Sequence, residues 1–437
     1  MTAANGALDG TPVVLDRAPV VLDRTPVVPD RAPMVLDRTP VVIAARRTPI
    51  GTAGHALARV DLVGLLAPVL RALVEDLGPA APAVDDVVIG NCRGPGGNPA
   101  RVAALAAGLG TAVPGVTVDR QCGSGQEAVH QGATAVLAGV ADLVLAGGAE
   151  SASTAPWRLA RPTTPTGMPI PYERAPFAPS EIGDPDMGPA AEAVAARCGV
   201  TRARQDAYAA RSHALTLAAA RAGVFDAEIV PVAGVDSDER PRRLNEAALA
   251  RMRPAFVPGG TVTAGNCCGV SDGAAAVAIV PAYLRAALGV PGLALRGWVC
   301  VGLDPNIPGL GPVPAVEKLL KGAGITLAEV GVLEMTEAFA AQVLACTDAL
   351  GLHPLDSLDP LDPLNPPHPL DPLGSDAARV CPQGGAIAMG HPWGASGAML
   401  VVRLFAQMVR VDGPRFGIAT CAIGGGQGLA LLAERVG

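Results

Sequence analysis

Short strand-like and helix-like segments alternate over most of this chain, and that alternation constrains its fold more than any other feature. "VPGVTVD" (113–119) predicts a strand, the stretch 121–139 predicts a helix with Cys122 just ahead of it, and "ADLVLAGGAE" (141–150) predicts the next strand. Strands that alternate with helices favour parallel pairing through right-handed crossovers in a layered α/β fold. Similar segments recur after residue 293. We therefore expect two duplicated α/β halves with the functional site between them.

Changes in composition mark the predicted domain boundaries. A heptapeptide that contains Pro is repeated four times within residues 11–38. Proline at this spacing predicts an extended or disordered tail, and a partner-binding arm is the alternative. The predicted parts are a tail (1–38), an N-terminal half (39–152), an inserted loop domain (153–252), the completion of the N-terminal half (253–292) and a C-terminal half (293–437) with a Pro-rich insertion (353–374).

Charge and cysteine usage exclude several classes of function. The net charge of −7 gives no support for a nucleic-acid partner. We find no apolar run long enough for a membrane span, and no signal peptide in "MTAANGALDG". The nine cysteines lack CxxC pairs and zinc-site spacing, so we expect reduced thiols, a cytoplasmic location and no metal site.

Cys122 is the candidate nucleophile. It lies on a predicted strand-to-helix turn, where unpaired backbone N–H groups and the helix dipole favour an anion. We expect this position to lower the pKa of the thiol and to produce a reactive thiolate. The alternative is a buried, inert cysteine.

Two further stretches could converge on Cys122. "GHPWGASGA" places His391 in a Gly/Pro turn ahead of a helix, where a neutral imidazole could take the thiol proton; a capping or core histidine is the alternative. "TEAFAAQV" begins with Thr336, which we predict as the N-cap of a helix starting at Glu337. "IGGGQG" (423–428) matches a phosphate-binding loop only weakly, and its backbone N–H groups could instead form an oxyanion hole.

Eight stretches resemble, in order and spacing, the signatures of the thiolase family. They are "VDRQCGSGQEAV", "LAGGAESAS", "DMGPAAEAVA", "ARSHALTLAAARAGVFDAEIVPV", "TVTAGNCCGVSDGAAAV", "TEAFA", "GGAIAMGHPWGASGA" and "GGGQG". The match covers residues 39–437 outside the two low-complexity runs. The resemblance implies a five-layered αβαβα fold with a loop domain that binds coenzyme A. It also implies a homodimer or homotetramer that needs no cofactor, because coenzyme A is substrate and product.

The resemblance also implies roles for individual residues. Cys122 is the residue that becomes acylated, and His391 activates it. The positions that contact the pantetheine or acyl group in the family are occupied here by Phe256, Ala264, Cys268 and Phe339. Trp393 either narrows the acyl pocket or packs beneath the turn, and we favour the second interpretation.

Three positions depart from the family pattern. Thr336 replaces an asparagine that positions a water in one oxyanion hole, and Cys268 replaces a serine. The second catalytic cysteine of the family, the base for the α-proton, directly precedes "IG"; Ala422 stands there, and Cys421 comes one residue earlier. One residue changes the face of a strand, although an irregular turn could still bring Cys421 into the site as that base. Loss of a positioned base costs on the order of 10²- to 10⁴-fold in rate.

These observations leave three functions open. The first is a thiolase-type acyltransferase of lipid metabolism that cleaves 3-ketoacyl-CoA or joins two acyl-CoAs by Claisen condensation. The second is an acyl-cysteine enzyme that transfers its acyl group to water, an amine or an alcohol, which the shifted cysteine favours. The third is a non-catalytic protein that binds coenzyme A or serves as a structural partner; the presence of Cys122, Glu337 and His391 argues against it.

Overall fold

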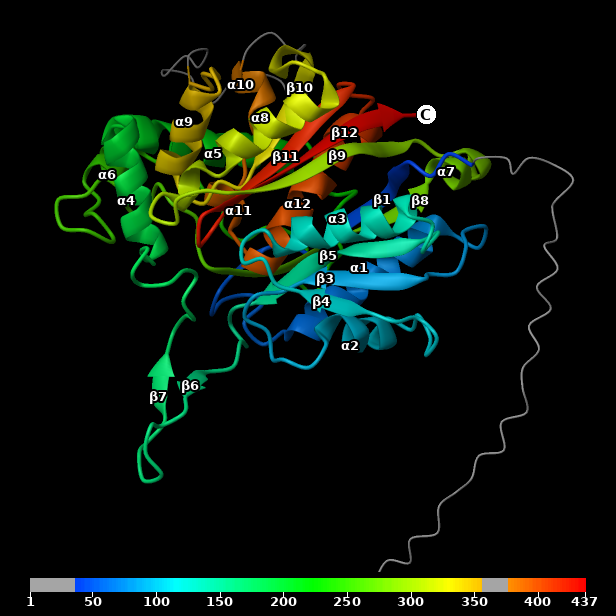
Figure 1. Cartoon of the computed structure of the whole chain (residues 1–437). Coiled ribbons are helices and arrows are strands. Elements are labelled where there is room, and N and C mark those ends of the chain that lie inside the picture. The colour runs from blue at the N-terminus through cyan, green and yellow to red at the C-terminus, as the bar shows by residue number, and fades with distance from the viewer. Residues whose placement is uncertain (1–35, 356–375) are drawn as a thin grey trace, which may run out of the picture. The chain divides into compact units, whose positions relative to one another are not determined.

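The computed structural model describes residues 36–355 and 376–437 (Figure 1). The predicted tail up to residue 35 and the Pro-rich insertion from residue 356 onward lie outside the described residues. Asp37–Gly437 group into one compact unit. Arg38, at the start of that unit, donates to the carbonyls of Val136 and Ala141 and pairs with Asp142 at 2.8 Å. Within the described ranges, no helix combines the length and the apolar character needed to cross a bilayer.

One large mixed sheet runs through this unit. Its strand order is β10-β11-β12-β9-β1-β8-β5-β3-β4, with β2 beside β8. The two halves of the sheet join where β1 pairs with β9, through Val41–Ala294 and Val42–Leu293. The strands are β1 Pro40–Arg47, β2 Gly51–Thr52, β3 Asp86–Gly90, β4 Val116–Val118, β5 Val144–Ser151, β8 Ser271–Pro281, β9 Gly292–Gly302, β10 Val330–Met335, β11 Phe416–Ile423 and β12 Gln427–Val436.

The expectation of parallel pairing is correct for part of the sheet and wrong for its centre. The pairs β3–β4, β3–β5 and β10–β11 are parallel. The pairs β5–β8, β8–β1, β1–β9, β9–β12 and β12–β11 are antiparallel. Residues 424–426 alone join β11 to β12, and a connection this short permits a hairpin but not a parallel crossover.

The helices complete five layers. The helices α3 (Ser124–Leu137) and α12 (Trp393–Phe405) pack together between the two sheet halves, as Figure 1 shows. The helices α1 (Leu62–Leu77) and α2 (Pro99–Ala106) cover the outer face of one half, and α8 (Pro312–Ala323) covers that of the other. The predicted αβαβα fold is confirmed.

Strand β8 shows how the sequence specifies these layers. Every residue of β8 is buried, which is typical of a strand covered on both faces. Successive side chains point to opposite faces. Ala275, Val277 and Ile279 therefore join the core around α3 and α12, whereas their neighbours Ala274 and Ala276 join the core beneath α1 and α2.

Glycines allow α3 and α12 to approach closely. A Cβ atom on Gly125 would lie 2.7 Å from the carbonyl oxygen of Gly394, and one on Gly397 would lie 2.6 Å from the backbone nitrogen of Gln126. Any larger residue at either position would force the helices apart. The starts of the two helices, which carry Cys122 and His391 just ahead of them, are consequently held side by side.

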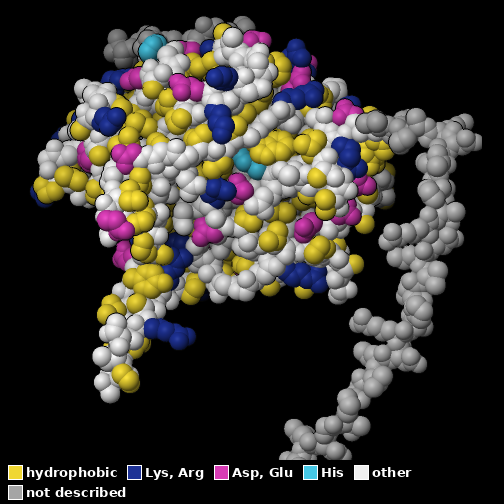
Figure 2. All heavy atoms as spheres, in the orientation of Figure 1, with side chains coloured by type: hydrophobic (Ala, Val, Ile, Leu, Met, Phe, Trp, Pro, Cys, Tyr) yellow, Lys and Arg dark blue, Asp and Glu magenta, His cyan; other side chains and the backbone are white. Residues whose placement is uncertain are grey.

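The segment predicted as a loop domain contains a hairpin and three helices. The hairpin consists of β6 (Arg158–Ala160) and β7 (Ile170–Tyr172), and Figure 2 shows hydrophobic side chains along it. The helices α4 (Met187–Cys198) and α5 (Arg202–Arg221) pack on α9 (Ala340–Ala349). The remaining short elements are α6 Glu246–Ala250, α7 Ala282–Leu288, η1 Pro308–Leu310, η2 Leu327–Glu329, α10 Asp376–Arg379, α11 Ala386–Met389 and η3 Ala406–Arg410.

A buried ion-pair network connects β1 to the central helix α12. Glu228 pairs with Arg47 at 2.7 Å and also with Arg403, and Arg47 pairs with Asp238. The side chains of Arg47 and Glu228 are fully buried. Charges removed from water in this way are tolerated only while each keeps its partner.

We expect Glu228→Gln to lower the free energy of unfolding by about 3–5 kcal/mol, because it removes the carboxylate paired with Arg403 and one of the two carboxylates paired with Arg47. The matched control is Asp76→Asn, which removes the partly exposed pair with Arg46 and should cost less than about 1 kcal/mol. Urea denaturation measures both. Equal, small losses in the two variants would contradict the importance of the buried network.

Candidate active site

Cys122 lies on a tight turn two residues before α3. Gln121 has a φ of 46°, a left-handed conformation that is uncommon for a residue other than glycine. Its N–H donates to Asp119 Oδ1 at 2.8 Å, and its carbonyl accepts from Ser124 Oγ at 2.6 Å and from Cys92 Sγ at 2.9 Å. These hydrogen bonds stabilise the strained turn that positions the Cys122 sulfur.

The Cys122 side chain lines a cavity of about 100 Å³ that segments distant in sequence build together. His391 and Trp393 come from the start of α12, Phe339 from the start of α9, and Cys268 from the loop before β8. The three stretches expected to converge therefore do meet at one cavity.

His391 is held by its backbone and by one ring nitrogen. Its N–H donates to the carbonyl of Gly269 at 3.1 Å, and its Nδ1 lies 2.6 Å from Ser396 Oγ. The Ser396 hydroxyl donates its single hydrogen to the carbonyl of Pro392 at 3.1 Å, so we assign the ring proton to Nδ1. Nε2, which has no hydrogen-bond partner among the described residues, is then a proton acceptor. Burial lowers the pKa of His391 to about 4, so the ring is neutral at neutral pH.

The thiol of Cys122 is also neutral at rest. Burial raises its pKa to about 11. The backbone N–H groups of Gly424 and of Cys122 itself oppose this rise by donating to the thiolate, while the charges of Glu150 and Asp119 add to it. The expected lowering of the thiol pKa by the helix start is therefore wrong, because desolvation outweighs the nearby N–H groups.

The other residues predicted to bind substrate lie at different distances from this cavity. Cys268 and Phe339 line it. Phe256 is 45% exposed and packs edge-to-face on Phe339, with ring centroids 6.1 Å apart. Ala264 is exposed on the loop between Phe256 and Cys268. Trp393 lines the cavity with Arg93 above its ring at 5.3 Å, so the interpretation that it packs beneath the turn is wrong.

Cys421 and Thr336 do not line the Cys122 cavity. Cys421 is fully buried, and its Sγ lies 3.4 Å from the carbonyl oxygen of Cys122 and 3.2 Å from that of Ala422. Ala422, the next residue of β11, lines the cavity in its place. Their catalytic roles stay predictions.

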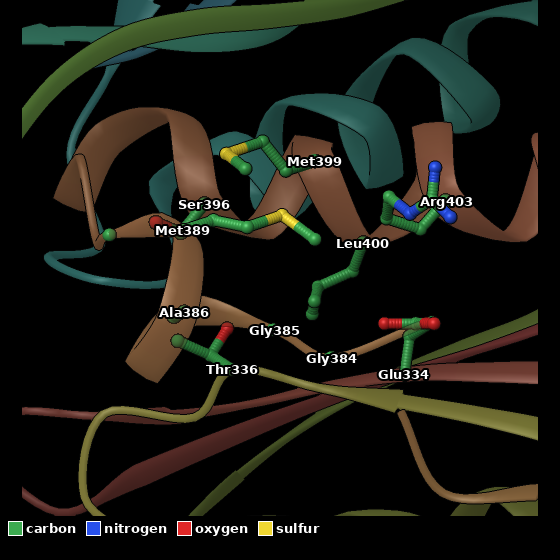
Figure 3. Close-up of a pocket in the computed structure, with 11 residues that line it drawn as sticks. Glu334, Thr336, Gly384, Gly385, Ala386, Met389, Ser396, Met399, Leu400 and Arg403 are labelled. Atoms are coloured by element: carbon green, nitrogen blue, oxygen red, sulfur yellow. The ribbon is translucent and has the colours of Figure 1, made fainter. Parts of the chain in front are cut away.

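Thr336 lines a second, smaller space of about 20 Å³, which Figure 3 shows between Glu334, Ser396 and Arg403. The predicted N-cap role of Thr336 is wrong. The helix α9 begins at Ala340 with Phe339 as its N-cap, while the N–H of Thr336 continues the sheet by donating to the carbonyl of Thr420 at 3.1 Å.

Two buried glutamates, Glu150 and Glu337, support the site through hydrogen bonds to the loops around it. Glu150 accepts hydrogen bonds from the N–H groups of Cys92, Arg93 and Gly394, each at 3.1 Å, and so ties the loop after β3 to the start of α12. The sequence did contain a sign that Glu150 is buried and paired, because this lone carboxylate follows a run of small apolar residues in "VLAGGAE".

Glu337 likewise holds two segments together through hydrogen bonds to its buried carboxylate. Its carboxylate accepts from Tyr208 Oη at 2.9 Å, from Ser212 Oγ at 2.6 Å and from the N–H of Ile387 at 3.2 Å. These bonds connect α5 to α11, the short helix that leads into His391. The position of the imidazole thus depends on the packing of the inserted segment.

Family models match almost the whole folded unit. The model described as "Thiolase, N-terminal domain" matches residues 40–283, and that described as "Thiolase, C-terminal domain" matches residues 290–435. The chain belongs to the thiolase family. The resemblance found in its motifs is therefore confirmed.

Curated relatives and solved structures agree with this membership. This thiolase is 42% identical over 401 residues to the putative acetyl-CoA C-acetyltransferase VraB of Staphylococcus haemolyticus, covering 90% of this chain and 98% of the relative. It is 41% identical to the acetyl-CoA acetyltransferase of Pseudomonas aeruginosa, with the same coverage. The structure of the Bacillus anthracis acetyl-CoA acetyltransferase matches with a TM-score of 0.80 and 33% identity over 92% of this chain and 100% of that one. Human mitochondrial 3-ketoacyl-CoA thiolase matches with a TM-score of 0.79 and 30% identity over 91% and 99%.

We expect the alkylation of Cys122 by iodoacetamide to rise about tenfold per pH unit between pH 7 and 9, because the thiolate fraction grows at this rate below a pKa of about 11. Peptide mass spectrometry measures the rate at that residue, and Cys122→Ser identifies the modified peptide. A plateau below pH 8 would contradict the neutral resting thiol.

Proposed function

We propose that this thiolase is an acyltransferase that acts on acyl-CoA through an acyl-Cys122 intermediate, cleaving 3-ketoacyl-CoA or condensing two acyl-CoAs. The observation that supports this most directly is the shared cavity of a nucleophilic thiol, Cys122, and a neutral imidazole, His391. The relatives named acetyl-CoA acetyltransferase and 3-ketoacyl-CoA thiolase support the same class of reaction.

In the first half-reaction, Nε2 of His391 takes the proton of the Cys122 thiol, and the thiolate attacks the carbonyl carbon of the substrate. The negative charge then passes from sulfur to the carbonyl oxygen. The N–H groups of Cys122 and Gly424, which already favour negative charge on the sulfur, are placed to stabilise an oxyanion beside it. A thiol with a pKa of about 11 depends on this proton transfer for its reactivity.

The aromatic pair of Phe256 and Phe339 provides the entrance for the pantetheine arm in this proposal. Phe339 lines the cavity, and the exposed Phe256 extends the same apolar wall outward. Cys268 and the exposed Ala264 lie on the loop next to this wall. Coenzyme A enters and leaves here as substrate and product, so the reaction needs no cofactor. We further propose a homodimer or homotetramer in the cytoplasm.

One observation favours a second candidate function. Ala422 lines the cavity, whereas Cys421 is directed toward backbone carbonyls. If no other group removes the α-proton, the acyl group on Cys122 passes to water, an amine or an alcohol. A purely coenzyme-A-binding role is less well supported, because it gives no reason for the shared cavity of Cys122 and His391.

We expect Cys122→Ser to abolish acyl transfer while leaving the fold intact. The wild-type chain, incubated with acetoacetyl-CoA, should carry an acetyl group on Cys122 by mass spectrometry. The variant should carry none and should lose on the order of 10³-fold or more in thiolysis, because the nucleophile acts as a unit with its base. Circular dichroism checks the fold.

Thiolysis is followed at the thioester absorbance, with and without added coenzyme A. Consumption of acetoacetyl-CoA that needs added coenzyme A supports the acyltransferase. Consumption at the same rate without it identifies a hydrolase, and undiminished thiolysis by Cys122→Ser would rule out the assigned nucleophile.

A further inference from the structure

A second thiol, that of Cys268, lines the same cavity as Cys122. The backbone N–H of Cys268 donates to the carbonyl of Ala338 at 3.0 Å. The neighbouring Cys267 forms an antiparallel backbone β-bridge with Phe339. These contacts fix the loop before β8 against the start of α9. A negative charge on Cys122 would raise the pKa of Cys268. The two cysteines thus line one shared cavity.

The cavity offers few groups that can carry a proton. Among the described residues that line it, the side chains that titrate are Cys122, His391 and Cys268. The methyl group of Ala422 cannot carry a proton, and Cys421, although it packs against Cys122, does not line the cavity. Cys122 and His391 are already occupied in forming the acyl-enzyme. Cys268 is the remaining group that could exchange a proton with the α-carbon of the substrate.

We propose that Cys268 is the second proton-transfer group of the reaction, giving a proton to the enolate carbon in cleavage and removing it in condensation. This inference rests on the proposed acyl-Cys122 function and assigns a residue to its carbon–carbon step.

The protons and electrons of cleavage balance with this assignment. His391 Nε2 takes the Cys122 proton, and the thiolate attacks C3 of the 3-ketoacyl-CoA. The tetrahedral intermediate collapses, the C2–C3 bond breaks, and its electron pair forms the enolate of the shorter acyl-CoA. The Cys268 thiol protonates C2 and becomes a thiolate.

Acyl transfer to coenzyme A restores the starting state. The Cys268 thiolate takes the proton of the incoming coenzyme A thiol, and the sulfur of coenzyme A attacks the acyl-Cys122 carbonyl. Cys122 leaves as a thiolate and recovers its proton from His391. Condensation follows the same steps in reverse.

The surroundings of Cys268 favour the thiol as its resting form. Burial is the main cause that raises its pKa; a negative charge on Cys267 or Cys122 would raise it further, and Arg240 opposes the rise. A protonated thiol is the form that cleavage requires from this group, since the enolate must receive a proton. Cleavage therefore starts from the resting protonation state of the site, whereas condensation first needs a deprotonated Cys268.

The test separates formation of the acyl-enzyme from proton transfer at carbon. Acetylation of Cys122 by acetyl-CoA is followed by mass spectrometry, and exchange of the acetyl-CoA methyl hydrogens is followed by NMR in deuterium oxide. Cys268→Ser keeps the size and polarity of the side chain but gives it a far less acidic group. We expect this variant to lose about 10²- to 10⁴-fold in exchange, far more than it loses in the acetylation of Cys122.

Cys267→Ala is the matched control, because Cys267 is buried beside Cys268 but does not line the cavity. It should retain both rates. Three results would overturn the inference. The first is wild-type exchange in Cys268→Ser, and the second is an equal loss of acetylation and exchange in that variant. The third is loss of exchange in Cys421→Ala instead. Absence of acetylation in the wild-type chain would overturn the proposed function itself, and the acetylation assay reports this separately.

Discussion

The close packing of α3 against α12 is the constraint on which the rest of the site depends. Glycines at 125 and 397 allow the helices to touch between the two sheet halves. Because Cys122 and His391 lie just ahead of the two helix starts, the same packing brings the thiol and the imidazole to one cavity. The N-terminal ends of helices carry positive potential, so two such ends beside one cavity also suit a developing oxyanion.

Buried carboxylates hold the loops around this pair of helices. Glu150 fastens the start of α12 to the loop after β3, and Glu337 fastens the inserted segment to the turn before His391. A buried carboxylate that accepts three or more hydrogen bonds stabilises one loop arrangement strongly, since any other arrangement leaves charge unsatisfied. The positions of the loops around the Cys122–His391 cavity therefore depend on the N-terminal half and on the inserted segment together.

Burial gives the site two neutral partners instead of an ion pair. It raises the pKa of the Cys122 thiol to about 11 and lowers that of the His391 imidazole to about 4. In the proposed reaction, a substrate fills the cavity and receives negative charge on its carbonyl oxygen, and this changes the balance because the N–H groups then act on the oxyanion. In the same proposal, a protonated Cys268 is the form that can give a proton to an enolate in the cavity.

The sequence by itself determined the α/β class, the duplicated halves, the family and the choice of Cys122 and His391, because each depends on residues close together in the chain: hydrophobic periodicity, a cysteine or histidine at a helix start, glycines beside it. The tertiary structure alone decided the antiparallel centre of the sheet, the place of Thr336, the cavity-facing position of Ala422 in front of Cys421, and the nearness of Cys268 to Cys122. It also reversed the expected direction of the Cys122 pKa shift. Strand direction depends on distant partners, and desolvation depends on every segment that closes the cavity, so neither can be read from a local stretch of sequence.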